Sequence, residues 1–191
     1  MRNPATSPTA LNKALRRFRR NRRGSAAIEF ALIAPLFFVM LFAIMETALM
    51  FFAAQVLETG TQDSARLMLT NQALNAGMTQ TQFTADLCNR VKVLFTCDAT
   101  SSSPLSVSVR SYAPGVTIPA ADLADPIVNR AFVNNAVYQM PKSGDTVLVR
   151  TFYSWPLFVT GLGYNISNIG SNSSSYKRVL AATAAFRTEP Q

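Results

Sequence analysis

The sequence contains no histidine, only two cysteines and few charged residues, which make up 15% of its 191 residues. Without histidine there is no His-based triad, no His proton shuttle and almost none of the usual zinc or haem sites. Cys88 and Cys97 alone are too few for a tetrahedral metal site. No acid pair, glycine-rich phosphate loop or nucleophile–base pair is evident. The sequence therefore indicates no enzyme, cofactor, metal or small-molecule substrate.

Acidic residues are absent from the first 23 residues, which carry all of the excess positive charge. This head holds eight Lys and Arg residues, whereas the rest of the chain has ten basic and ten acidic ones. The net charge of +8 therefore describes a basic head on a neutral body, rather than a surface for nucleic acid. A nucleic-acid arm or a mitochondrial transit peptide would have a similar composition, but here a long apolar run follows.

That apolar run predicts a transmembrane helix. Residues 30–45 (FALIAPLFFVMLFAIM) include no charged or polar side chain, and after Glu46 and Thr47 the run continues to Leu57. As a helix, residues 31–54 would be roughly 36 Å long, which exceeds the ~30 Å hydrocarbon core of a bilayer. The alternative is a buried core helix, but a chain of this length has little protein with which to surround it.

The basic residues before the run predict its orientation. They are Arg16, Arg17, Arg19, Arg20, Arg22 and Arg23. Since the next basic residue is Arg66, the positive-inside rule places the N-terminus in the cytoplasm and residues 60–191 on the far side. Arg16-Arg17 is also similar to a twin-arginine signal, but the residues that follow fit that signal poorly.

Two acids, Glu29 and Glu46, lie beside and within the run. A charge at the centre of a single transmembrane helix costs about 2.5–3.5 kcal/mol on insertion scales. As an interfacial acid in the first helical turn, Glu29 would be favoured by the helix dipole. Glu46 is predicted to be a membrane-embedded acid that snorkels or is protonated near the outer boundary.

The segment around Glu29 resembles the cleavage site of type IV prepilins. Basic residues lead to Gly24, small residues follow, and Glu29 and Phe30 are the fifth and sixth residues after Gly24. In that class a membrane aspartyl peptidase cuts after the glycine and the apolar helix is retained. The resemblance implies that Gly24, Ser25, Glu29 and Phe30 form a processing site. Glycine lets the backbone enter a protease cleft, and Glu29 would then neutralise the new α-amino group at Ser25.

Residues 24–36 (GSAAIEFALIAPL) resemble the start of the TadE/TadG-like proteins of the Tad (Flp) pilus system. Typical members read G-x-A-A-V-E-F-A-L, continue with an apolar run, and have an acid near its end, here Glu46, and an Ala-Arg pair, here Ala65-Arg66. Residues 186–190 also resemble the family's common ending. The chain is too short for the von Willebrand-type domain often attached to TadG, so it fits TadE or its paralogue TadF.

The resemblance implies a minor pilin-like subunit, or pseudopilin, needed to assemble or initiate an adhesive pilus. The implied partners are membrane lipid, prepilin peptidase, other pilin-like subunits and the Tad inner-membrane assembly platform. The implied location is the bacterial inner membrane, crossed once, with a periplasmic body and incorporation at the pilus tip or base. The alternative is a signal-anchored periplasmic binding or sensing module that is not cut at Gly24.

The predicted fold class is α+β, with a long N-terminal helix followed by a second helix and an antiparallel sheet. We expect a basic leader over 1–24, a transmembrane helix over 25–57, a helical stalk over 58–77 and a periplasmic domain over 78–191. The long helix would run to about residue 76, and Gly60 would allow a bend within it.

Within the distal domain, local patterns predict the elements. A capping box at Thr79 and Gln82 and an apolar stripe (Phe83, Leu87, Val91 and Leu94) predict an amphipathic helix over 80–95. In an oxidising periplasm Cys88 and Cys97 would form a disulfide, with two free buried thiols as the alternative.

Strands are predicted at 105–110, 146–153 and 179–186, although the alanines of the last segment also suit a helix. Asp125-Pro126 would begin a short helix that runs to Tyr138. Residues 164–176 are polar and predict a loop. One further group is either an exposed aromatic–basic patch or largely buried in the sheet: Arg150, Tyr153, Trp155 and Phe158.

Overall fold

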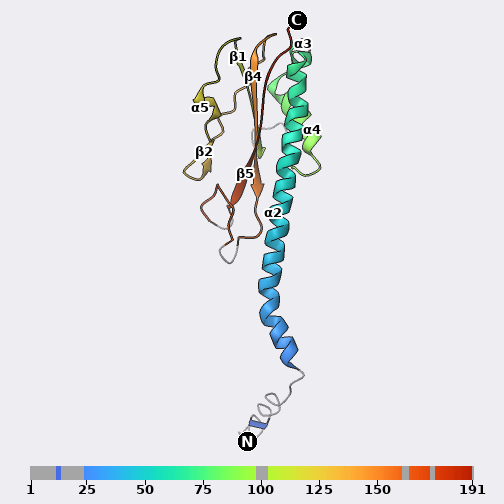
Figure 1. Cartoon of the computed structure of the whole chain (residues 1–191), viewed down its shortest axis with the longest axis vertical. Helices are drawn as coiled ribbons and strands as arrows, with labels where there is room; N and C mark the ends of the chain where they lie inside the picture. Colours follow the sequence, from blue (N-terminus) through green and yellow to red (C-terminus); the bar gives the residue numbers. More distant parts are fainter. Residues whose placement is uncertain (1–11, 14–23, 98–102, 161–163, 173–174, 191) are drawn as a thin grey trace, which may run out of the picture. The chain divides into compact units, whose positions relative to one another are not determined.

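The computed structural model describes residues 12–13, 24–97, 103–160, 164–172 and 175–190. The chain divides into two compact units, Met1–Ala43 and Ile44–Gln191. One helix, α2 (Ser25–Leu69), contributes its first part to the first unit and its remainder to the second (Figure 1).

Helix α2 is long and apolar enough to cross a membrane, and no other helix in the described ranges meets that criterion. Its most apolar 18-residue window has a mean hydropathy of 2.5. In the first unit its large apolar side chains are exposed: Ile28, Phe30, Leu32, Ile33, Leu36, Phe37, Phe38, Met40, Leu41 and Phe42. Apolar surface all around a helix is typical of a segment that lies in lipid or packs against other helices.

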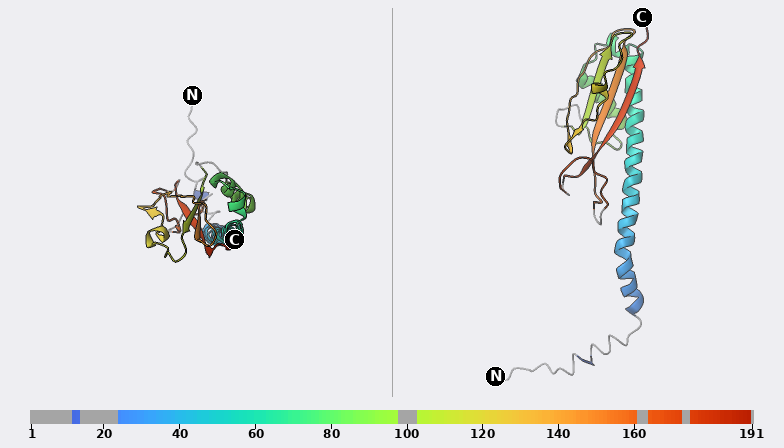
Figure 2. Two further views of the ribbon diagram at one scale, coloured as in Figure 1. Left: turned by 90° about the horizontal axis from the view of Figure 1, so that it is seen from above. Right: turned by 60° about the vertical axis from the view of Figure 1, so that its left-hand side comes forward.

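The second unit is built on a three-stranded antiparallel sheet, which confirms the α+β fold. Its strands are β1 (Leu105–Tyr112), β4 (Thr146–Pro156) and β5 (Lys177–Arg187), in the order β1-β4-β5. Helix α4 (Gln80–Val91) and the second part of α2 cover one face (Figure 2). The other face carries α5 (Ala120–Leu123) and a small hairpin of β2 (Ile127–Val128) and β3 (Ala131–Phe132).

The core of the second unit lies between the sheet and the two helices. Alternate strand residues point into it, as the period of two in a strand requires, and Val107, Val149 and Ala182 are examples. From α2 it receives Met50, Ala53, Leu57, Ala65 and Met68. Residues 50–68 of α2 therefore form one wall of the domain core.

Helix α4 has the cap and the stripe that its sequence predicts. The Thr79 side chain accepts from the Gln82 backbone and the Gln82 side chain accepts from the Thr79 backbone. Phe83, Leu87 and Val91 are each at most 1% exposed, so the stripe is core. The helix ends at Val91, a few residues earlier than expected.

Helix α2 also ends earlier than expected, at Leu69 rather than near residue 76. Asn71 adopts a left-handed backbone with φ of 59°, which breaks the helix before the short helix α3 (Gln72–Asn75). Gly77, with φ of +60°, follows α3. The chain reverses direction through these residues and enters α4.

The helix predicted from Asp125 to Tyr138 is wrong. Asp125 caps a turn instead, since its carboxylate accepts from the Ile127 N–H at 2.9 Å. Asn129 and Arg130 have φ of 50° and 60°, the conformation of a tight hairpin turn, and they join β2 to β3. Beyond the hairpin, the chain runs along the free edge of β1: the Val109 N–H donates to Val137 at 2.7 Å. Long-range pairing replaces the local helix.

Candidate processing and assembly sites

Gly24 immediately precedes α2, which begins at Ser25. Gly24 has no positive φ, and no atom of the described residues lies within 4 Å of the Cβ that another residue would add there. The fold of the described residues therefore gives no reason for glycine at this position. A requirement for glycine at this point would come from an interaction outside the fold, and cleavage after Gly24 stays a prediction.

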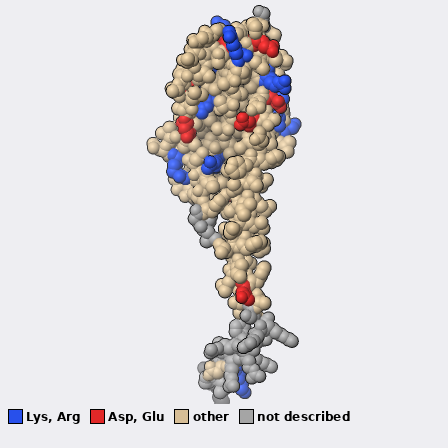
Figure 3. Space-filling view, in the orientation of Figure 1, with Lys and Arg blue, Asp and Glu red and all other residues tan. Residues whose placement is uncertain are grey.

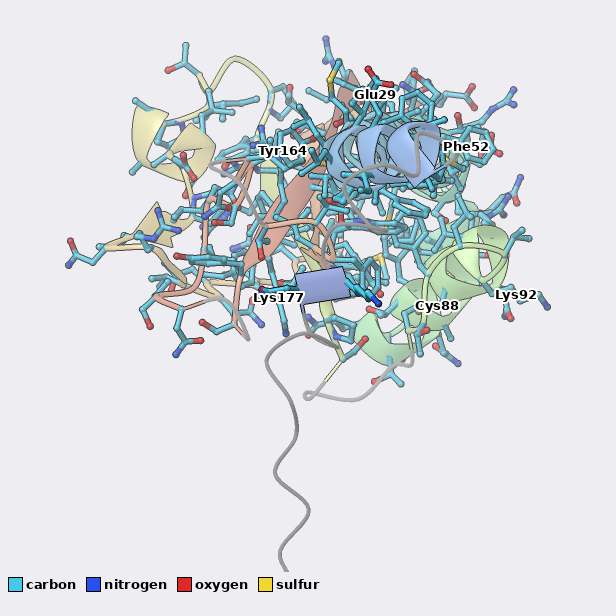
Figure 4. The ribbon with its side chains drawn as sticks, turned by 90° about the horizontal axis from the view of Figure 1, so that it is seen from below. Glu29, Phe52, Cys88, Lys92, Tyr164 and Lys177 are labelled. Atoms are coloured by element: carbon cyan, nitrogen blue, oxygen red, sulfur yellow. A yellow bond between two sulfur atoms is a disulfide. The ribbon has the colours of Figure 1, made fainter. Side chains whose placement is uncertain are left out.

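Glu29 and Phe30 lie on the first turns of α2, where both are exposed. Phe30 has 67% of its surface exposed. By sequence, Glu29 is the single charged residue between Gly24 and Met45, and Figure 3 shows an isolated acidic patch on an otherwise uncharged stretch. Figure 4 labels Glu29 at the periphery of the helix. A carboxylate in this position is available to a partner subunit, while its role there stays a prediction.

The arginines predicted to set the topology lie outside the described residues. They are Arg16, Arg17, Arg19, Arg20, Arg22 and Arg23.

Glu46 is buried in the second unit, at 7% exposure. Its carboxylate accepts hydrogen bonds from the backbone N–H groups of Phe158 and Val159, the latter at 3.1 Å to Oε2. The next residue, Thr47, shares a hydrogen bond between its hydroxyl and that of Tyr164. The acid thus ties helix α2 to the chain that follows β4.

The sequence identifies Glu46 as an unusual acid but does not identify its partners. Phe158 lies 112 residues further along the chain, and no local pattern in the sequence links the two positions. An isolated acid in an apolar run indicates that some partner exists, because an unpaired buried charge is costly. Only the fold identifies that partner as backbone.

Cys88 on α4 and Cys97 form a disulfide, as predicted, with their Cα atoms 5.9 Å apart. The alternative of two free thiols is wrong. The bridge closes the segment that carries Phe95, whose ring lies 4.6 Å from Tyr153 and 5.7 Å from Trp155. The disulfide therefore fixes an aromatic cluster between the helix end and β4.

The suggested aromatic–basic patch does not form a single surface. Tyr153 is 5% exposed and Trp155 is partly buried against Phe95. Arg150 donates to the carbonyl oxygens of Asp122 and Ala124, and burial lowers the pKa of its guanidinium. Phe158, by contrast, is 81% exposed.

A small polar cavity that the sequence did not reveal lies over β1 and β4. Its volume is about 110 Å³, and an ion pair of 3.0 Å between Arg110 and Asp122 lies at its wall. Ligand pockets usually measure roughly 300–1,000 Å³. The cavity is thus small for the ligand that a periplasmic binding module would capture.

Residues 24–66 match the family model described as TadE-like protein. This match confirms the TadE/TadG-like resemblance of the segment. The matched segment lies largely within α2, the helix that is long and apolar enough to cross a membrane. No curated protein and no solved structure matches the chain.

Proposed function

We propose that this chain, TadE-like over residues 24–66, is a minor pilin-like subunit that assembles or initiates a Tad-type adhesive pilus. Its apolar helix packs laterally against other pilin-like subunits and against the inner-membrane assembly platform. The exposed apolar side chains along the first part of α2 support this role, because they offer a continuous surface to lipid or to neighbouring helices.

In this proposal a prepilin peptidase cuts after Gly24 on the cytoplasmic side of the inner membrane, and the body lies in the periplasm. The basic leader serves to insert the helix in the correct orientation and is then removed. All of the excess positive charge leaves with it, since the remaining residues are balanced in charge.

Glu29 then neutralises the new amino group of Ser25 or that of a neighbouring subunit. A paired charge is far less costly in an apolar assembly than an isolated one. The observation that carries the proposal is the position of Gly24: it directly precedes the helix, within the TadE-like segment, where the fold makes no demand for glycine.

Two substitutions test the proposal in a strain that lacks its own copy of the gene. With Gly24→Val, the intact mass of the membrane-extracted protein should retain the leader, whereas the wild type should begin at Ser25. With Glu29→Ala, the protein should be made and inserted but should fail to support piliation.

Glu58→Ala is the matched control, because Glu58 is a second acid on the same helix and lies outside the processing segment. It should leave piliation intact. Normal piliation with Glu29→Ala would contradict the proposed role of that residue. A mature wild-type protein that keeps residues 1–24 would favour the alternative, an uncut signal-anchored binding module.

A further inference from the structure

We propose that the loop after β4, residues 157–160, enters the lipid interface beside helix α2 and is held there by Glu46. The inference rests on the proposed membrane anchoring of α2. The partner of this loop is then the lipid surface. From the sequence alone, the loop would lie wholly in water, because residues 60–191 are expected on the far side of the membrane.

The position of the loop along the helix brings it within reach of lipid. The hydrogen bonds from Phe158 and Val159 to Glu46 place the loop beside residue 46 of the helix. Further towards the C-terminus, α2 still exposes Leu49, Phe51 and Phe52, at 55%, 67% and 58%. Phe51 lies five residues beyond Glu46, or roughly 8 Å along the helix axis. Lipid that covers Phe51 and Phe52 therefore also reaches the level of the loop.

Hydrogen bonds to Glu46 make the loop backbone compatible with this depth. Irregular backbone is tolerated at membrane depth only where its polar groups have partners, because no water is available there. Glu46 provides that partner for two successive N–H groups. The same bonds compensate the carboxylate, which is otherwise costly to place in an apolar run. Glu46 and the loop backbone thus satisfy each other's hydrogen bonds, so both can lie at this depth.

The side chains of the loop fit an interfacial location. Phe158 presents 81% of its surface, whereas the neighbouring Leu157 is 8% exposed and anchors the loop to the body. At the same end of the sheet, Lys177 pairs in register with Pro156 and is exposed. An aromatic ring at the tip with a lysine behind it is the arrangement of an interfacial anchor, in which the cation meets lipid phosphates.

The test uses the full chain reconstituted in phosphatidylcholine–phosphatidylglycerol vesicles. Because Cys88 and Cys97 are disulfide-bonded, Phe158→Cys introduces a single reactive thiol for a polarity-sensitive fluorophore. The matched control is Val93→Cys, since Val93 is 85% exposed on the same unit. It closely follows Val91, which lies beside Gly60 on α2, well beyond Glu46 along the helix. Ile33→Cys, on the apolar part of α2, reports whether the helix itself is inserted.

We expect the probe at position 158 to show blue-shifted emission, quenching by lipids that carry a shallow spin label, and protection from aqueous iodide. The probe at position 93 should be quenched by iodide alone. Iodide quenching at 158, with lipid quenching at 33, would overturn the inference and leave the membrane anchor intact. Protection at 158 from both quenchers would also overturn it, in favour of a protein partner. Absence of lipid quenching at 33 would instead contradict the membrane anchor on which the proposed function rests.

A second pair of variants tests Glu46 as the positioning residue. Glu46→Gln keeps one acceptor oxygen and should leave the probe at 158 in lipid. Glu46→Leu replaces the side chain with an apolar one of similar size and removes both acceptor oxygens. It should make the probe at position 158 accessible to iodide, while the probe at position 33 stays in lipid. Lipid quenching at 158 that persists in Glu46→Leu would overturn the role given to Glu46.

Discussion

The side-chain amide of Asn71 donates a 2.7 Å hydrogen bond to the carbonyl oxygen of Glu189, across 118 residues of sequence. In return, the Glu189 N–H donates to the carbonyl of Leu69 at 2.9 Å. The C-terminal segment thus satisfies a carbonyl at the end of α2 that no residue of the helix reaches. This contact gives Glu189, near the end of the chain, a physical role in the fold.

Substitution of Asn71 should separate its two contributions to stability. Asn71→Gly loses the hydrogen bond but also removes the Cβ from a left-handed backbone that glycine adopts readily, so it should cost at most about 1 kcal/mol. Asn71→Ala keeps a Cβ at φ of 59° but lacks the polar side chain with which Asn tolerates the left-handed conformation, so it should cost about 2–3 kcal/mol in total. Urea unfolding of the detergent-solubilised chain measures both. Equal losses in the two variants would show that the backbone conformation contributes nothing.

Substitution of Gly60 by alanine should destabilise the protein, although alanine is usually preferred to glycine within a helix. A Cβ at position 60 would lie 2.5 Å from Cγ1 of Val91 on α4. Overpacking costs about 1–3 kcal/mol, whereas alanine gains at most about 1 kcal/mol in helix propensity. Gly60→Ala should therefore lower the free energy of unfolding by about 1 kcal/mol.

The control for Gly60→Ala is the same substitution in a Val91→Ala background. Without the clash, only the propensity gain remains, so the effect should change sign and stabilise by up to about 1 kcal/mol. A loss of similar size in both backgrounds would contradict the close approach of the two helices.

The helices and strands that the sequence predicts correctly are those specified by patterns within their own residues. The capping box of Thr79 and Gln82 specifies the start of α4, and alternation specifies β1, because each pattern lies within the element that it forms. The predicted helix over 125–138 failed because its chain is bound to the edge of β1 by the hydrogen bonds of Val109. Nothing within 125–138 encodes that partner.

The same distinction applies to the functional residues. The segment from Gly24 to Phe30 was recognisable because its residues are contiguous. Glu46 was recognisable as unusual, but its bonds to Phe158 and Val159 depend on the packing of the whole unit. From the sequence, Gly60 was expected to allow a bend in the helix, whereas the structure shows that it provides space for Val91.

Removal of the disulfide should destabilise the second unit. Cys88 and Cys97 are nine positions apart, so loop closure gives an upper value of about 2.5 kcal/mol. We expect Cys88→Ala combined with Cys97→Ala to lose up to this amount in urea unfolding, and reduced wild type to match the double variant. Alkylation of the unreduced protein, followed by mass spectrometry, should modify no thiol. Two alkylated thiols in that experiment would refute the bridge.

The stability of the second unit should also fall at high pH, because of two partly buried tyrosines, Tyr138 and Tyr112. Burial raises the pKa of Tyr138 to about 12, and its hydroxyl donates to the Met78 carbonyl at 2.7 Å. Burial, together with the neighbouring Asp122, likewise raises the pKa of Tyr112 to about 12. Both hydroxyls are neutral in the folded and unfolded chain below about pH 10, where this contribution to stability is complete.

Between about pH 10 and pH 12 the unfolded chain releases these protons while the folded chain retains them, so the free energy of unfolding decreases. Tyr138→Phe should lower stability at neutral pH, since it loses the bond to Met78, but should reduce the decline above about pH 10. Urea unfolding across this range and near-ultraviolet absorbance of tyrosinate measure the two effects. A decline in Tyr138→Phe as steep as in the wild type would mean that other groups, and not Tyr138, lose their protons on unfolding.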